Sequence, residues 1–115
     1  DRVPAYTYFY VREDDDKIIG MINIRLALND FLRKEGGHIG YCIRPAERRK
    51  GYGTRMLREA LQFLKPIGLT DIIITCGKEN KASAGVIKNC GGVLEDEFYS
   101  DIFNEVIQRY RICMK

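Results

Sequence analysis

The residues best suited to chemistry in this chain form one short basic run that contains glycine. The run consists of Arg48, Arg49, Lys50, Gly51, Tyr52, Gly53 and Thr54. An apolar, strand-like run (residues 37–43) precedes it, and an amphipathic, helix-like pattern (residues 54–64) follows it. The first N–H groups of a helix lack partners and carry partial positive charge, glycine allows close backbone approach, and basic side chains attract anions. The order strand, basic turn, helix therefore predicts a phosphate-binding loop, with a solvated basic turn as the plain alternative.

The spacing within this loop narrows the kind of phosphate site. The pattern G-x-G-x-x-G fails at Met56, and G-x-x-x-x-G-K-[ST] is absent from the sequence. The pattern present is R-x-x-G-x-G, at Arg48, Gly51 and Gly53. It follows a strand that ends in an aliphatic residue, and an x-Pro pair at Pro45 lies between the strand and the motif. This window resembles the pyrophosphate-binding loop of the GNAT superfamily of N-acetyltransferases, which use acetyl-CoA.

A second motif supports the same resemblance. Asn80, followed three residues later by Ser83 and then by a helix that ends at the glycine pair 91–92, resembles the second GNAT motif. The resemblance implies that Asn80 and Ser83 line the coenzyme channel. It also implies that the strand ending at Cys42 and Ile43 leaves backbone groups free for the pantetheine arm, and Gly40 in that strand is compatible with a close backbone approach. Acetyl-CoA is therefore the expected cosubstrate, and no metal is expected.

The catalytic groups are less clearly marked. The resemblance implies direct attack of an amine on acetyl-CoA, without a covalent enzyme intermediate. Many GNAT proteins place a tyrosine seven residues after the motif asparagine as the acid for the leaving thiol, but that position is Ile87 here. As a base, His38 has an ordinary pKa near neutrality, with Glu35 as an alternative and a structural histidine as the plain interpretation. Four other tyrosines remain open as the acid, namely Tyr41, Tyr52, Tyr99 and Tyr110.

The elements that must position these residues follow from hydrophobic periodicity. Strands are expected at residues 5–12, 18–28, 38–43, 71–76, 93–98 and 106–114, and helices at 54–64 and 82–89. A short helical turn is expected after Asn29 or Asp30. One face of the second strand is expected to be buried through Ile18, Ile22, Ile24, Leu26 and Leu28.

The order of these elements predicts the fold class. The first two strands predict an antiparallel hairpin, and the strand, helix and strand between residues 38 and 76 predict a right-handed parallel crossover. The expected fold is a single α/β domain over residues 1–115. It is GNAT-like, with a mixed central sheet of about six to seven strands and two main helices.

Composition excludes several classes of protein. The 115 residues are 45% hydrophobic, which suits one domain with a core, and no run approaches the ~20 apolar residues of a membrane span. A net charge of +3 does not require nucleic acid, although a small nucleic-acid binder using residues 44–50 is a distant alternative. The four cysteines lack metal-ligand spacing, so free thiols in a reducing cytoplasm are expected. The acidic run at residues 13–17 predicts a solvated hairpin turn and not a metal site.

The resemblance to the GNAT superfamily implies an N-acetyltransferase that moves an acetyl group from acetyl-CoA to a primary amine of an unidentified small molecule or peptide. The alternative is a non-catalytic acyl-CoA-binding or regulatory GNAT-fold module, because Ile87 replaces the tyrosine and residues 1–115 lack the strand and two helices that usually precede the hairpin in GNAT proteins. Either the acceptor side is then built differently, or the chain is a core fragment of a longer one. A tyrosine-rich first strand with a free edge predicts a homodimer. Four acidic residues would suit a cationic acceptor, or would only solvate a surface, namely Glu95, Asp96, Glu97 and Asp101.

Overall fold

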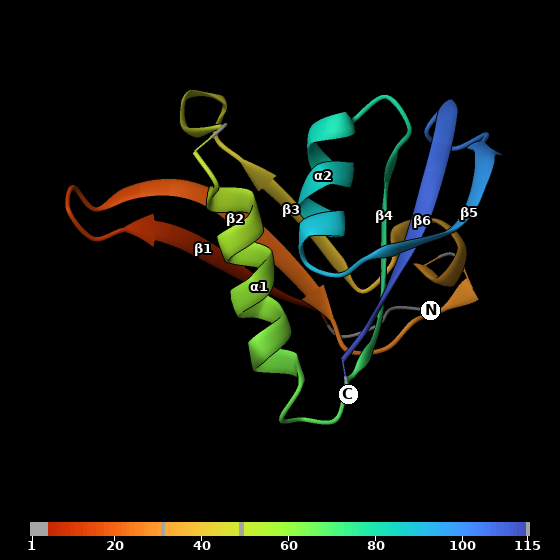
Figure 1. Cartoon of the computed structure of the whole chain (residues 1–115), viewed down its shortest axis with the longest axis horizontal. Helices are drawn as coiled ribbons and strands as arrows, with labels where there is room; N and C mark the ends of the chain where they lie inside the picture. The colour runs from red at the N-terminus through yellow and green to blue at the C-terminus, as the bar shows by residue number, and fades with distance from the viewer. Residues whose placement is uncertain (1–4, 31, 49, 115) are drawn as a thin grey trace.

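The computed structural model describes residues 5–30, 32–48 and 50–114, apart from the side chains of residues 34, 35 and 45 (Figure 1). Within these ranges the chain forms six strands, two α-helices and two short helical turns. In chain order they are β1 (Ala5–Arg12), β2 (Lys17–Arg25), the π-helical turn η1 (Leu32–Gly36), β3 (Ile39–Ile43), the 3-10 turn η2 (Pro45–Glu47), α1 (Tyr52–Leu64), β4 (Asp71–Gly77), α2 (Lys81–Asn89), β5 (Val93–Ser100) and β6 (Glu105–Cys113).

The strands form two antiparallel three-stranded sheets, in the orders β1-β2-β3 and β4-β6-β5. As expected for a crossover, β3 and β4 run in the same direction, and they diverge toward their carboxyl ends (Figure 1). They meet at their starts, where the His38 N–H donates to the Ile73 carbonyl at 2.6 Å and Gly37 bridges to Ile74. The expected α/β fold is therefore confirmed, but its sheet is split between β3 and β4. This split is called the fork below.

Helix α1 closes the core because its apolar residues recur at helical spacing. The apolar side of the amphipathic pattern at residues 54–64 is buried in full, and it consists of Met56, Leu57, Ala60, Leu61 and Leu64. These residues belong to one cluster with Ile24 of β2, Ile74 of β4 and Ile87 of α2. Figure 1 shows α1 in front of the first sheet and α2 in front of the fork. The two helices therefore cover the same face of the sheets.

The buried face of β2 differs from the expected one near its start. Ile18 was expected in the core but is 45% exposed, whereas Ile19 is fully buried. The cause is a bulge in the hairpin. Tyr10 pairs with Gly20 and Val11 pairs with Ile18, so Ile19 is an extra residue and the alternation of faces is interrupted there. Simple alternation could not predict this position.

The connection from β2 to β3 contains the expected helical turn. β2 ends at Arg25, earlier than the expected residue 28, and the chain then enters η1. Of the two expected caps, Asn29 fills the role, because its side-chain oxygen accepts the Leu32 N–H at 2.9 Å. The turn ends at Gly36, and Gly37 follows it with a left-handed φ of 71°. This arrangement returns the chain to the start of β3.

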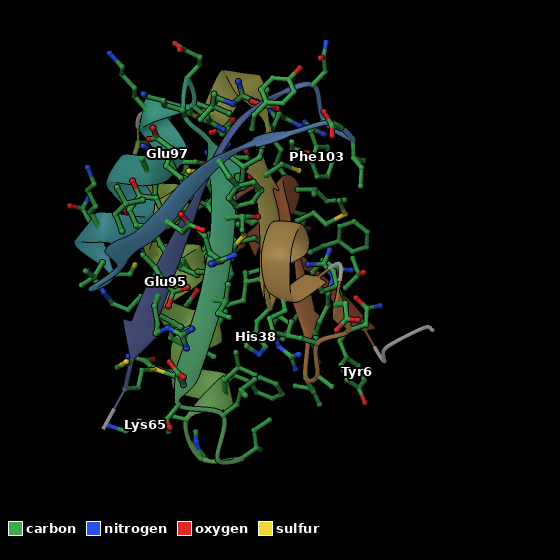
Figure 2. All side chains as sticks on the ribbon, turned by 90° about the vertical axis from the view of Figure 1, so that its right-hand side faces the viewer. Tyr6, His38, Lys65, Glu95, Glu97 and Phe103 are labelled. Atoms are coloured by element: carbon green, nitrogen blue, oxygen red, sulfur yellow. The ribbon has the colours of Figure 1, made fainter. Side chains whose placement is uncertain are left out.

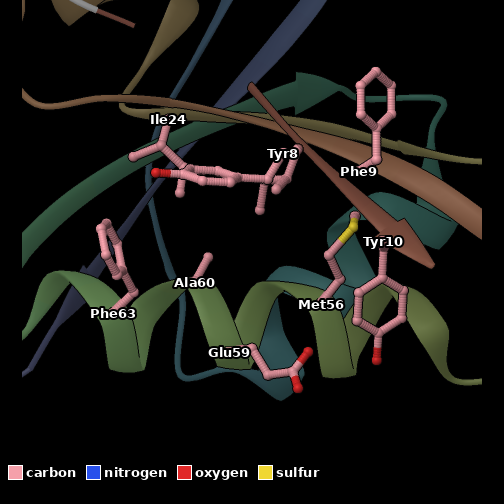
Figure 3. Close-up of a pocket in the computed structure, with 9 residues that line it drawn as sticks. Tyr8, Phe9, Tyr10, Ile24, Met56, Glu59, Ala60 and Phe63 are labelled. Carbon is pink, nitrogen blue, oxygen red and sulfur yellow. The ribbon is translucent and has the colours of Figure 1, made fainter. Parts of the chain in front are cut away.

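A largely apolar cavity of about 240 Å³ lies between β1 and α1 (Figure 3). Tyr8 and Phe63 face each other there, with ring centroids 6.2 Å apart, and Tyr10, Ile24 and Met56 complete the wall. Glu59 supplies one carboxylate to this cavity. The cavity shares no lining residue with the fork pocket described next, although Tyr10 at its edge lies 6.2 Å, between ring centroids, from Tyr52 of the basic loop.

Candidate active site

The start of α1 carries the geometry expected of an anion-binding turn. Gly51 is the N-cap of the helix and has a left-handed φ of 83°, and no side chain caps the helix start. The first N–H groups, those of Tyr52, Gly53 and Thr54, therefore lack a side-chain partner. A Cβ placed on Gly51 would meet nothing within 4 Å, so space lies open beside the turn. Such a helix start binds phosphate groups readily.

The basic loop is held in place by a buried carboxylate that the sequence analysis did not single out. Glu47 is 3% exposed, and its oxygens lie 2.8 Å from Arg12 Nη1, 3.0 Å from Lys50 Nζ and 3.7 Å from Lys17 Nζ. Arg12 also donates to the Tyr52 hydroxyl at 3.2 Å. Hydrogen bonds from Lys50 and Arg12 lower the pKa of Glu47. The spacing of Glu47 and Lys50 was a possible signal, but the strand partners were not visible in the sequence.

The other basic residues of the loop are placed differently. The Arg48 Nε donates to the Ile43 carbonyl at 3.1 Å, so this side chain is bound to the end of β3. Arg49 lies outside the described residues. A Cβ on Gly53 would lie 3.2 Å from Val86 Cγ2, which shows that Gly53 allows close packing of α1 against α2. Gly51 and Gly53 thus serve different purposes.

A pocket of about 290 Å³ occupies the fork. Three of the residues predicted from the sequence meet there. The Tyr41 hydroxyl donates to the Ser83 carbonyl at 3.4 Å, and the Asn80 side-chain oxygen accepts the Ser83 N–H at 3.2 Å, which caps α2. Cys76 at the end of β4 also lines this pocket. The fork therefore brings the strand tyrosine and the second motif to one place.

Burial changes the acidity of two groups in this pocket. It raises the pKa of the Tyr41 hydroxyl, which is therefore protonated at neutral pH and can donate a hydrogen bond. Burial also raises the pKa of the Cys76 thiol, so its reactive thiolate form is disfavoured. This direction favours a structural role for the Cys76 thiol.

His38 has the environment of a structural residue. It is 6% exposed, and its side-chain Nδ1 accepts the Ile73 N–H at 2.9 Å. The main-chain N–H of His38 donates to the Ile73 carbonyl. Burial lowers the pKa of His38, with a smaller opposing effect of Asp71, so the neutral ring persists at neutral pH. Figure 2 shows His38 and Phe103 toward opposite ends of β4, and Phe103 lines the fork pocket. These contacts give the expected role of His38 as a base no support.

The strand β3 presents alternate side chains to the two faces of the fork. Tyr41 pairs with Ile22 on the helix-covered face, whereas Cys42 pairs with Met21 and is exposed on the other. Cys42 can therefore serve the expected coenzyme site only through its main chain. β3 pairs with β2 along one edge, and the ladder to β4 among the described residues is confined to its start. The second edge of β3 is thus open toward the fork.

Three of the four acidic residues considered for a cationic acceptor, Glu95, Asp96 and Glu97, form ion pairs from β5, where Figure 2 labels Glu95 and Glu97. Glu95 lies 2.9 Å from Arg109 and 2.6 Å from Arg111, and Glu97 lies 3.2 Å from Lys78. Neighbouring cations therefore balance these charges. None of these acidic residues is among the described residues that line the fork pocket.

A sequence profile described as the acetyltransferase (GNAT) family matches residues 1–91 of this chain. The chain belongs to the GNAT family. Among curated proteins, this GNAT chain is similar to N-acetyltransferase family 8 member 3 of Rattus norvegicus, with 23% identity over 111 residues. That alignment covers 96% of this chain and 49% of the rat protein, so the chain spans about half the length of the relative that it matches.

Solved acetyltransferase structures share the fold of this GNAT chain. Ribosomal-protein-S5-alanine acetyltransferase from Vibrio fischeri matches with a TM-score of 0.80 and 22% identity, over 95% of this chain and 61% of that one. A GNAT-family acetyltransferase from Bacillus anthracis matches with a TM-score of 0.77 and 23% identity, over 93% and 65%. Spermidine N-acetyltransferase from Vibrio cholerae, in complex with CoA and spermine, matches with a TM-score of 0.77 and 16% identity, over 95% of this chain and 65% of that one.

The rest of the described GNAT chain adds three findings. No group of three or more His, Cys, Asp or Glu residues suited to a metal ion occurs among the described residues. No helix in the described part is both long enough and apolar enough to cross a membrane. The four cysteines are free thiols.

Acidification is expected to destabilise this GNAT chain between about pH 4.5 and about pH 2. Arg12 lowers the pKa of Asp15 to about 2, and Lys50 and Arg12 lower the pKa of Glu47 from its ordinary 4.5. Because both carboxyls bind protons more readily when unfolded, their contribution to stability is present above pH 4.5 and is lost as pH falls through the lowered values. Urea unfolding at pH 7, 4 and 3 measures this loss. Glu47→Gln should show a smaller loss on acidification, and an unchanged pH profile in this variant would contradict the assignment.

Proposed function

We propose that this GNAT chain is an N-acetyltransferase that transfers an acetyl group from acetyl-CoA to a primary amine of a small molecule or peptide. The observation that carries the proposal is the helix start at Gly51, which has open space beside it and no side-chain cap. The fork pocket, which is lined by Tyr41, Asn80 and Ser83, lies beside β3, the strand that precedes the basic loop. An anion-binding turn joined to such a pocket suits a long substrate with phosphates at one end and a reactive group at the other.

In this proposal the chain's own groups divide the work of binding. The N–H groups from Lys50 to Thr54 bind the pyrophosphate, and Arg48 and Arg49 add positive charge. The open edge of β3 near Cys42 and Ile43 binds the pantetheine arm. Asn80 and Ser83, at the start of α2, line the channel between the pyrophosphate site and the pantetheine site. This binding set is the one implied by the family resemblance, and its geometry is compatible with the described residues.

Acetyl-CoA supplies an activated thioester, whose sulfur leaves as a thiolate. Tyr41 is proposed to donate a hydrogen bond through its one hydroxyl hydrogen to that sulfur, in exchange for the 3.4 Å hydrogen bond that it donates to the Ser83 carbonyl in the structure. Full proton transfer from Tyr41 is uphill, because its raised pKa exceeds the value of ~8.5 typical of a thiol. Stabilisation of the thiolate by a hydrogen bond is therefore the role expected of this hydroxyl. The proposal assigns no general base, since the Nδ1 of His38 is occupied by a backbone N–H.

Tyr41→Phe is expected to lower the turnover number about 10- to 100-fold while leaving the affinity for acetyl-CoA unchanged, since only a donor to the departing sulfur is lost. Steady-state kinetics and calorimetry measure the two quantities. Tyr6→Phe is the matched control, because Tyr6 is 47% exposed on β1. Equal turnover in the wild-type chain and Tyr41→Phe would remove Tyr41 from the mechanism.

Calorimetric titration with acetyl-CoA and with dephospho-CoA tests the proposed function. Saturable binding at one site is expected, with weaker binding of dephospho-CoA if the basic loop contacts the 3′-phosphate. An absence of binding by the folded chain would overturn the proposal. Binding without acetyl transfer to any amine of a broad panel would instead support the second candidate, a non-catalytic acyl-CoA-binding module. Ile87, which is fully buried where many relatives carry a tyrosine, favours that candidate.

The partners and location of the chain form a separate part of the proposal. Among the described strands β1 pairs only with β2, and it exposes Phe9 and Val11 at 62% and 46%. We propose that this edge meets a second copy of the chain, and a single monomeric species in sedimentation velocity would contradict this. A cytoplasmic location is proposed on the basis of the four free thiols, and cell fractionation tests it.

A further inference from the structure

The fork pocket has two faces with different chemistry. Tyr41 points toward α2 on the face covered by the helices, as its hydrogen bond to Ser83 shows. Alternate strand residues point to opposite faces, so Arg25 of β2 lies on the face opposite to Ile24, which packs in the core. Gly40 shares this second face, because its strand neighbour Tyr41 points to the first. The second face also has its own walls in the pocket, formed by η1 and the β5–β6 turn.

Two hydrogen bonds to main-chain carbonyls position Arg25 on this second face. Its Nη1 donates to the Gly36 carbonyl at 3.2 Å and to the Gly37 carbonyl at 3.0 Å. Both acceptors are neutral main-chain groups, and among the described residues no carboxylate pairs with this guanidinium. Burial lowers the pKa of Arg25 from its ordinary value, yet an arginine remains charged at neutral pH. A half-buried, positioned cation that has no anionic partner among the described residues is therefore present in the fork.

The space around Arg25 suits a ligand. A Cβ placed on Gly40 would meet only the Arg25 Nη2, at 3.8 Å, so the surface next to this nitrogen is open. Leu32 of η1 and Phe103 of the β5–β6 turn line the same pocket and are apolar. Arg25 carries the one formal charge among the described residues that line it. The pocket thus combines one fixed cation with apolar walls.

We propose that the acceptor amine carries a carboxylate and an apolar group, as an amino acid with a large side chain does, and that Arg25 binds the carboxylate. This inference rests on the proposed acetyltransferase function and names the substrate class of the same site. Guanidinium and carboxylate match in charge and geometry, whereas a polyamine brings only positive charge toward Arg25. Phe103 and Leu32 contact the apolar group.

The transfer that this binding supports balances without an added reagent. The lone pair of the neutral amine forms the new C–N bond to the acetyl carbon, and the C–S bond breaks with its electron pair on sulfur. The proton released by the amine balances the thiolate. Arg25 takes no part in these bond changes, so it is a residue for substrate recognition.

Product binding tests the inference without turnover. The chain is saturated with coenzyme A and titrated calorimetrically with N-acetyl-L-phenylalanine and, separately, with N-acetyl-L-phenylalaninamide. The acid is expected to bind about 10-fold more tightly or better, because the amide cannot form a charge-assisted pair with Arg25. This comparison uses the unaltered chain, so it does not depend on whether a variant folds. Equal affinities, tighter binding of the amide, or no binding of the acid to a chain that binds coenzyme A would overturn the inference and leave the proposed function intact.

Variants locate the preference at one residue. Arg25→Gln is expected to remove the difference between acid and amide, and Arg25→Lys to retain part of it. Arg33→Gln is the matched control, because Arg33 lies on η1 and its side chain is 65% exposed. Its Nη1 lies 3.9 Å from the Asp30 Oδ1. Displacement of the acid by spermidine at equal concentration would overturn the inference. Failure of coenzyme A itself to bind would overturn the proposed function and the inference together.

Discussion

Gly51→Val is expected to weaken acetyl-CoA binding about 10- to 100-fold, measured by calorimetric titration. Gly51 has a left-handed φ of 83°, which a β-branched residue adopts only under strain. It is the N-cap of α1, whose first N–H groups would bind the phosphates. Valine would shift this turn and fill the open space beside it. Loss of one charge-assisted hydrogen bond costs about 1.5–3 kcal/mol, which corresponds to the expected range.

Gly68→Val is the matched control for this prediction. Gly68 follows the other end of α1, has a left-handed φ of 90°, is exposed, and has nothing within 4 Å of its added Cβ, as at Gly51. Both variants should lose similar stability, but only Gly51→Val should lose coenzyme affinity. Gly53 is a poorer test position, because its Cβ would press on Val86 at 3.2 Å. Equal affinities in the two variants would show that the α1 start does not bind the coenzyme.

Gly37→Ala is expected to lower the free energy of unfolding by about 2–5 kcal/mol, as measured by urea denaturation. Gly37 has a left-handed φ of 71°, and a Cβ there would lie 2.5 Å from the Ile73 carbonyl oxygen and 3.2 Å from Ile74 Cα. These are backbone atoms of β4, which cannot move aside as a flexible side chain does. The start of the fork must therefore open, and the backbone strain adds to this cost.

Gly91→Ala separates these two contributions. Gly91 has a left-handed φ of 94°, but a Cβ there meets nothing within 4 Å. This control should lose only about 1–2 kcal/mol, the cost of a left-handed non-glycine residue. A similar loss in both variants would show that the close approach of Gly37 to β4 contributes nothing.

Features that depend on neighbouring residues in the chain followed from the sequence. The stripe of α1 at Met56, Leu57 and Leu61 was predicted by helical spacing and is buried. A helix directly after the glycine turn was predicted from the order of strand, turn and helix. Its start was expected at residue 54, whereas α1 begins at Tyr52 with Gly51 as its N-cap. The cap at Asn29 was predicted as one of two choices. In each case the physical cause lies within a few residues of the chain, so periodicity and capping chemistry are sufficient.

Features that depend on contacts between distant segments were decided by the tertiary structure. Ile19 is buried in place of Ile18 because of a bulge opposite Val11. Glu47 is buried because Arg12, from the first strand, lies 2.8 Å away and neutralises it. The sheet splits where His38 stops bridging β3 to β4. Strand register and divergence set these contacts, and neither is encoded in a local pattern.

The candidate site shows the same division. The proposed coenzyme loop could be suggested from the sequence, because helix-start chemistry and glycine spacing are local properties of residues 48–54. The proposed acceptor side could not, because Arg25, Gly40 and Phe103 come from three separate segments and share no motif. His38 attracted attention through its ordinary pKa, but folding buried it and occupied its Nδ1. The sequence by itself determined which residues could bind a phosphate, and the tertiary structure decided which side chains line the fork pocket, because only the fork brings these separate segments together.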